Sequence, residues 1–215
     1  MTGGGAVERV AVVPRRASTR VVAAAALPHH DAAAASTKRG LRGGTAKRVL
    51  TELMQVAKGD ESVWLHSGEG VHLFPAEDDL TYMRALIEGP AGSPFAGGIF
   101  ALGVSIPSDY PESPPTIGFE TPIYHCNVSD AGAICLDLLR EKWSPSLTVP
   151  KLLEAIRFLM ASPNPDDALR QYLAELTISA AKSGGVDARY ADEARRRTAK
   201  DAGLSIEEWR QKWKC

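Results

Sequence analysis

The strongest constraint on the fold is an alternating segment at residues 100–106. Apolar side chains at positions 100, 102, 104 and 106 alternate with small or polar ones, which is the period of a strand with one buried face. The ranges 80–88 and 115–120 also read as strands, and Gly and Pro residues punctuate the connection between the first two ranges. Strands that follow one another through short loops predict an antiparallel meander.

Helical patterns flank these strands. Residues 45–57 place apolar side chains on one helical face, with Thr45 as the predicted N-cap. The stretch 110–143 has no regular period and is punctuated by proline, after which helical spacing returns behind Thr148. Asp167 stands where an acid would stabilise the start of the next helix. One helix, a meander, an irregular stretch and further helices predict an α+β fold.

The first 44 residues differ in composition from the rest. They are rich in Ala and Gly, contain no aromatic residue, and carry seven Lys and Arg against two acids. Such a segment buries too little apolar surface to offset the entropy of ordering it, so we predict a disordered basic tail at 1–44. A transit peptide is the alternative, because arginines lie there among Ala, Ser and Thr. We expect a folded core at 45–182 and a helical extension at 183–215.

Composition narrows the class of protein. No segment approaches the roughly 20 apolar residues of a membrane span, and a formal net charge of -1 gives no reason to expect nucleic acid as a partner. Three widely spaced cysteines argue against a disulfide scaffold and for a reducing compartment. The motifs of phosphate loops, zinc proteases, serine hydrolases and paired CxxC sites are absent from the sequence.

One cysteine in the irregular stretch is a candidate nucleophile. Cys135 stands between Gly132 and a short apolar turn, in loop-rich surroundings where a thiol can be accessible. A buried, inert thiol is the simpler alternative. A zinc site made by Cys135 with His125 and Cys126 is a third, although it lacks a spaced fourth ligand.

An ordered set of motifs surrounds this cysteine. They are Gly89-Pro90, Pro94-Phe95, Asp109-Tyr110-Pro111, Tyr124-His125-Cys126-Asn127, Ile134-Cys135-Leu136-Asp137-Leu138-Leu139-Arg140, Trp143-Ser144-Pro145 and Pro163-Asn164-Pro165-Asp166-Asp167. In order and separation they resemble the ubiquitin-conjugating enzymes, from about Ala46 to Leu176. One four-residue match arises easily by chance, but a set spread over about 130 residues is specific.

The resemblance implies a fold, a reaction and partners. The fold is a four-stranded antiparallel meander flanked by an N-terminal helix and C-terminal helices. Cys135 would accept ubiquitin from an activating enzyme as a thioester and pass it to a substrate lysine or to a ligase cysteine. The implied partners are ubiquitin, the activating enzyme, a RING-type or HECT-type ligase and protein substrates, in the cytoplasm or nucleus unless residues 1–44 target an organelle. ATP is used by the activating enzyme, so no cofactor or metal is expected in this chain.

The resemblance also implies roles for individual residues. Asn127 would stabilise the oxyanion or order the loop, while Asp137 and Asp167 would lie near the incoming lysine. His125 would be structural. The positions that match ligase-docking residues are Pro111, Glu112, Arg140, Ser144 and Pro145.

Two positions depart from the family pattern. Cys126 replaces the usual proline before Asn127, so we expect a less restrained loop. Glu112 stands where many members that act with ubiquitin have an apolar residue, so the choice of ligase is open.

Three other functions compete with ubiquitin conjugation. The first is conjugation of another ubiquitin-like modifier, although Asp137 and the run at 140–145 resemble members that act with ubiquitin. The second is a non-catalytic adaptor that binds ubiquitin or a ligase, but such adaptors lack the cysteine. The third is thiol redox chemistry between Cys126 and Cys135, which no surrounding redox motif supports.

Overall fold

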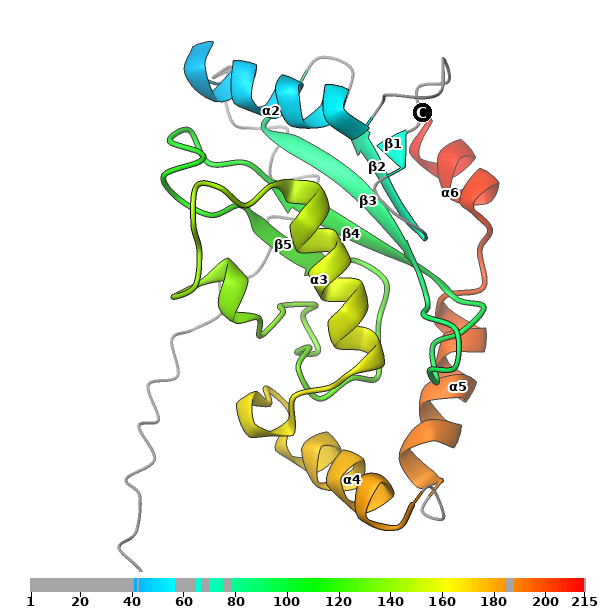
Figure 1. Ribbon diagram of the computed structural model, residues 1–215. Helices are drawn as coiled ribbons and strands as arrows, with labels where there is room; N and C mark the ends of the chain where they lie inside the picture. Colours follow the sequence, from blue (N-terminus) through cyan, green and yellow to red (C-terminus); the bar gives the residue numbers. More distant parts are fainter. Residues whose placement is uncertain are drawn as a thin grey trace, which may run out of the picture.

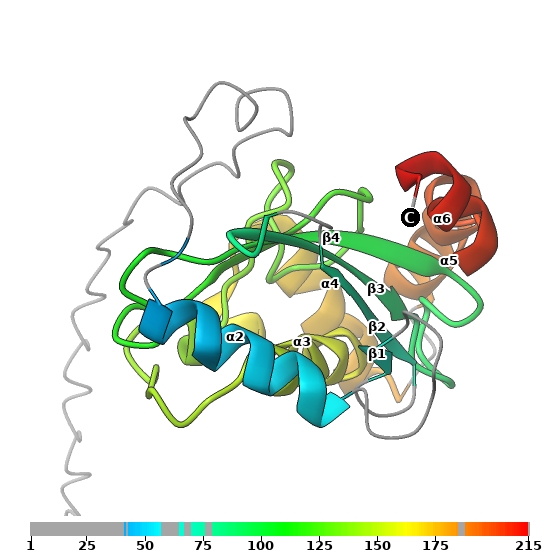
Figure 2. The same ribbon diagram turned by 90° about the horizontal axis from the view of Figure 1, so that it is seen from above.

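A central antiparallel sheet organises the molecule. The structure, a computed structural model, describes residues 41, 43–56, 65–66, 70–75, 79–184 and 188–214, so nearly all of the predicted tail lies outside the described residues. Helices α2 and α3 cover one face of the sheet, and α6 lies against the other (Figure 1, Figure 2). In the described part of the chain, no helix is long and apolar enough to cross a membrane.

The sheet is a meander in the order β1-β2-β3-β4-β5, as predicted. Its strands are β1 Leu65–His66, β2 Val71–Pro75, β3 Tyr82–Glu88, β4 Ile99–Ser105 and β5 Thr116–Phe119. The two-residue β1 adds a fifth strand to the expected four, and β2 is the strand that the periodicity did not locate. The register aligns Leu73, Ala85, Leu102 and Phe119 across neighbouring strands, and all four are buried. These four side chains belong to the main hydrophobic core.

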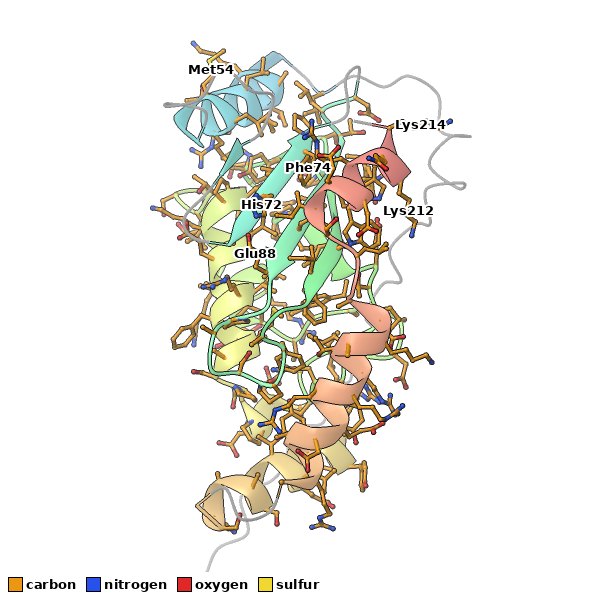
Figure 3. All side chains as sticks on the ribbon, turned by 90° about the vertical axis from the view of Figure 1, so that its right-hand side faces the viewer. Met54, His72, Phe74, Glu88, Lys212 and Lys214 are labelled. Carbon is orange, nitrogen blue, oxygen red and sulfur yellow. The ribbon has the colours of Figure 1, made fainter. Side chains whose placement is uncertain are left out.

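Helix α2 spans Gly43–Val56 and packs on that core through Val49 and Leu53. It begins two residues before Thr45, so the prediction of Thr45 as N-cap is wrong. Instead the Thr45 hydroxyl reaches the carbonyl oxygens of Ser108 and Tyr110, at 3.2 and 2.9 Å, and ties the helix to the loop after β4. Met54, expected on the apolar face, is 66% exposed and projects from the helix (Figure 3).

Helix α3 spans Val149–Ala161 and starts as the sequence predicts. Thr148 is its N-cap, and the Thr148 hydroxyl accepts a bond from the N–H of Lys151. Its buried side chains fill the core beneath the sheet; they are Val149, Pro150, Leu152, Leu153, Ile156, Leu159 and Met160.

The next helix begins later than predicted. Asp167 lies in a short 3-10 turn, η2, at Pro165–Asp167, and Ala168 is extended before α4 starts at Gln171 and runs to Lys182. The expectation that Asp167 caps a helix is therefore wrong, because an extended residue separates its turn from α4. The Asp167 carboxylate is left for another role.

Two more helices follow, α5 at Arg189–Asp201 and α6 at Ile206–Trp213. Helix α6 starts with a capping box between Ser205 and Glu208. Trp209 and Trp213 of α6 belong to a second, smaller apolar cluster with Phe74, Leu86 and Ala101 from the outer face of the sheet. Phe74 lies beside this helix (Figure 3), its ring centroid 5.6 Å from that of Trp213.

A buried carboxylate joins three parts of the fold. Glu52 of α2 accepts hydrogen bonds from the Tyr110 hydroxyl at 2.6 Å and from the N–H of Val149 at 3.0 Å. Its own helix supplies the counter-charge, Arg48 Nε at 2.5 Å. Glu52 therefore fixes the loop after β4 and the start of α3 against α2.

We expect Glu52→Ala to lower the free energy of unfolding by about 2–4 kcal/mol, because it leaves two buried donors without an acceptor and Arg48 without its counter-charge. Urea unfolding measures this change. The matched control is Glu207→Ala, which removes a carboxylate from an exposed pair with Arg210. That variant should lose less than about 1 kcal/mol. Equal losses in the two variants would contradict the role given to Glu52.

Candidate active site

His125 is a scaffold residue in the loop that follows β5. Its Nδ1 accepts a bond from the N–H of Asn127 at 3.1 Å, which leaves Nε2 to donate to the carbonyl of Leu159 at 3.0 Å. Burial lowers the pKa of His125 to about 4, so the ring is neutral. Both ring nitrogens therefore have protein partners, and the zinc alternative has no available His125 nitrogen in this arrangement.

The side chain of Asn127 joins two loops. It is fully buried, and its Nδ2 donates to the carbonyl oxygens of Asn164 at 2.6 Å and Asp167 at 2.9 Å. Its Oδ1 accepts from the N–H of Asn164 at 2.9 Å. We call these three bonds the Asn127 clamp. An amide has two N–H donors, and both are used here, so the geometry favours loop ordering over oxyanion stabilisation.

Asn164 is the partner that the sequence patterns left without a role. It lies within the Pro-Asn-Pro-Asp-Asp motif at 163–167, which marked the segment but not the two hydrogen bonds between the Asn164 backbone and the Asn127 side chain. The backbone of any residue except proline can supply both contacts, so the side chain at 164 carried almost no signal.

The thiol of Cys135 lies beside the clamp. The N–H of Cys135 donates to the carbonyl of Asn127 at 2.8 Å, and its Sγ donates to Oδ2 of Asp167 at 3.0 Å. Only 4% of Cys135 is exposed. Burial, and then the hydrogen bond to Asp167, raise the pKa of Cys135 to about 11, while Arg140 acts in the opposite direction. The thiol is therefore protonated at neutral pH.

Cys126 faces the core instead. It is fully buried, and its carbonyl accepts bonds from the N–H groups of Leu169 and Arg170 at 2.9 and 3.0 Å. Burial raises the pKa of its thiol as well. Its Sγ donates to Oδ1 of Asn127 at 3.3 Å, so the Cys126 thiol makes a further hydrogen bond to the Asn127 side chain, beside the three bonds of the clamp. The expectation of a less restrained loop at the position of the missing proline stays a prediction.

Asp137 is held at the surface. It starts the short turn η1, Asp137–Leu139, and its carboxylate forms an ion pair with Lys142 Nζ at 2.5 Å. This pairing raises the pKa of Lys142. Of the two acids singled out from the sequence, Asp167 is therefore the one whose carboxylate contacts the thiol.

The residues singled out for ligase docking come from two loops. Pro111 and Glu112 lie after β4, and Ser144 and Pro145 lie before α3. The carbonyl of Pro111 accepts from Trp143 Nε1 at 3.0 Å, which joins the loops. Arg48 of α2 donates to the carbonyl of Pro145 at 2.9 Å. These contacts place four of the five residues on joined loops.

Arg140 is the fifth residue singled out for ligase docking. It interacts with the Cys135 thiol as well as with the loop before α3. It follows η1 directly, and its positive charge lowers the pKa of Cys135, which partly offsets the effect of Asp167. Its backbone carbonyl also accepts the N–H of Trp143 at 3.1 Å. Arg140 thus connects the thiol with the loop before α3.

The chain is similar to known proteins in both sequence and fold. Residues 50–184 match the family model described as "Ubiquitin-conjugating enzyme". Among solved structures, the E2 domain of a Toxoplasma gondii ubiquitin conjugating enzyme is 34% identical, with a TM-score of 0.61. That similarity covers 73% of this chain and 99% of the other.

The matched segment contains strands β1 to β5, the Asn127 clamp and Cys135. Its sheet, with helices on both sides, is the fold that the sequence resemblance implied. The chain belongs to the ubiquitin-conjugating enzyme family.

Proposed function

We propose that this protein accepts ubiquitin from an activating enzyme as a thioester on Cys135 and transfers it to a substrate lysine, with a RING-type or HECT-type ligase. The observation that carries the proposal is the Cys135 thiol, hydrogen-bonded to Asp167 at 3.0 Å beside a loop that Asn127 holds in place. Membership of the family supports the general conjugating role.

Charging is an exchange between two sulfur atoms. Cys135 Sγ attacks the thioester carbonyl carbon at the C-terminus of ubiquitin, the new S–C bond forms, and the S–C bond to the activating enzyme breaks. The thiol proton ends on the departing sulfur. Since a thioester is already activated, alignment matters more here than a strong base. ATP is consumed by the activating enzyme and not by this chain.

Discharge to lysine uses Asp167. Once Cys135 is acylated, its sulfur has no proton to donate, so the Asp167 carboxylate becomes available to the ammonium of an incoming lysine. The ammonium first loses one proton to solvent, and the resulting amine attacks the thioester carbonyl carbon. The amide N–C bond forms, the S–C bond to Cys135 breaks, and the second proton of the amine ends on Cys135 Sγ, which is released as the thiol. We assign this recruiting role to Asp167 and not to Asp137, whose carboxylate pairs with Lys142.

We further propose that the joined loops carrying Pro111, Glu112, Ser144 and Pro145 dock the ligase. Glu112 is exposed, and its carboxylate favours a partner surface with a basic group over one that offers an apolar pocket. This acid bears on the choice of ligase and leaves the chemistry at Cys135 unchanged.

The proposal is tested by charging the full chain with activating enzyme, ATP and a panel of ubiquitin-like modifiers, read on a non-reducing gel. We expect a reductant-sensitive adduct with ubiquitin, a reductant-stable oxyester with Cys135→Ser, and no adduct with Cys135→Ala. Cys126→Ala is the matched control and should still charge. An adduct that persists in Cys135→Ala would overturn the assignment of the nucleophile, and charging only with another modifier would support the runner-up function.

Asp167→Asn should lower the pKa of Cys135, because it removes a negative charge that favours the protonated thiol. The rate at which iodoacetamide alkylates Cys135, followed by mass spectrometry, should therefore rise at lower pH than in the parent. Discharge to free lysine should slow, because the ammonium loses its partner. Asp166→Asn, which neutralises the adjacent exposed acid, is the control. Superimposable pH profiles for the parent and Asp167→Asn would refute the contact.

A further inference from the structure

Tyr124 directly precedes His125 in the active-site loop, and its ring contacts two side chains of helix α5. It is only 7% exposed, and its ring stacks on Tyr190 with centroids 5.9 Å apart and planes at 26°. The guanidinium of Arg197 lies over the Tyr124 ring, 4.4 Å from its centroid. Tyr190 and Arg197 are seven residues apart, so they lie on one face of α5.

A second cation supports the same ring from another direction. The guanidinium of Arg170, at the N-cap position of α4, is 5.6 Å from the Tyr124 centroid and also pairs with Asp130 at 3.2 Å. Arg197 is closer to the ring than Arg170. A guanidinium over an aromatic face is attracted by the negative charge of the ring face.

We propose that Arg197 is a positioning residue for the active site, which holds the loop of Asn127 in place through the ring of Tyr124. Helix α5 lies outside the segment 50–184 that matches the family model, so this contact joins the active-site loop to a part of the chain beyond that segment. The inference rests on the proposed function only where ubiquitin transfer is the readout.

The path from Tyr124 to the thiol is short: Tyr124 precedes His125 directly in the chain, and hydrogen bonds connect His125 to Cys135 through Asn127 and Asp167. His125 closes the turn, because its carbonyl accepts the N–H of Val128 at 3.2 Å and its Nδ1 accepts that of Asn127. Asn127 then holds Asp167 through the clamp, and Asp167 contacts Cys135. A displacement of Tyr124 is therefore carried to the carboxylate that contacts the thiol.

The charges on α5 supply a matched control. Glu193 bonds Arg197 Nε at 2.7 Å and bonds Arg196 through both of its oxygens, also at 2.7 Å. These two arginines, Arg196 first, lower the pKa of Glu193 to about 2. Loss of either arginine leaves Glu193 with the other. Truncating Arg197 removes the contact with the Tyr124 ring, whereas truncating Arg196 removes only a surface pair with Glu193. The two variants therefore differ in the ring contact.

The experiment compares Arg197→Ala, Arg197→Lys and Arg196→Ala with the parent, all as full-length chains. The first readout is the pH profile of iodoacetamide alkylation at Cys135, mapped by mass spectrometry, which needs no ubiquitin. The second is the rate at which the charged protein discharges to free lysine. A thermal melt confirms that each variant is folded at the assay temperature, and Arg197 is partly exposed, so its truncation leaves no cavity in the core.

We expect Arg197→Ala to move the Cys135 profile to lower pH, in the same direction as Asp167→Asn, and to slow discharge roughly two- to fivefold. Arg197→Lys keeps a cation over the ring, so it should restore most of the parent's alkylation profile and discharge rate. Arg196→Ala should match the parent in both measurements. In a Tyr124→Leu background the effect of Arg197→Ala should disappear. A profile for Arg197→Ala that superimposes on the parent, or an equal shift in Arg196→Ala, would overturn the inference.

The two proposals fail in different ways. If no variant, the parent included, forms a thioester with ubiquitin, the proposed function is wrong, and the alkylation profiles still decide the role of Arg197. If the parent charges normally but the profiles are identical, the function stands and the positioning role is rejected.

Discussion

The buried amide of Asn127 is the interaction on which the active site depends. It bonds the backbone of Asn164 twice and that of Asp167 once, so two segments far apart in sequence hold a single arrangement. Breaking one such bond leaves a buried polar group without a partner, which costs about 1–3 kcal/mol. The position of the Asp167 carboxylate relative to Cys135 follows from this amide. The asparagine thereby acts on the reaction through the placement of another residue's carboxylate.

The thiol that results is kept unreactive. A buried, protonated Cys135 that donates to a carboxylate is a poor nucleophile toward small electrophiles, because the thiolate is the reactive form. Selectivity then comes from binding, which brings an activated thioester to the sulfur. The rest of the fold serves that alignment, with Glu52 fixing the loop after β4 and α5 supporting Tyr124.

The sequence predicted those features that depend on local pattern or on spaced motifs. Alternation located β4, and two further strand-like ranges located β3 and β5. The Thr148 cap located α3, and the motif set pointed to Cys135 and Asp167. Patterns of this kind did not locate β2, and they placed the start of α4 too early at Asp167. They also left the role of Asn127 open between two alternatives. Its hydrogen-bond partners are backbone atoms about 40 residues away, and only the folded chain brings them together.

The most direct test is hydrogen exchange, followed by NMR, at the N–H of Asn164 and the Nδ2 protons of Asn127. It should be measured in the uncharged protein and in the ubiquitin oxyester of Cys135→Ser. If Asn127 is a structural clamp, both sets of protons exchange slowly in both states, although Asn164 is otherwise exposed. Loss of protection at Asn164 on charging would mean that the amide turns toward the reacting carbonyl, and would contradict the account.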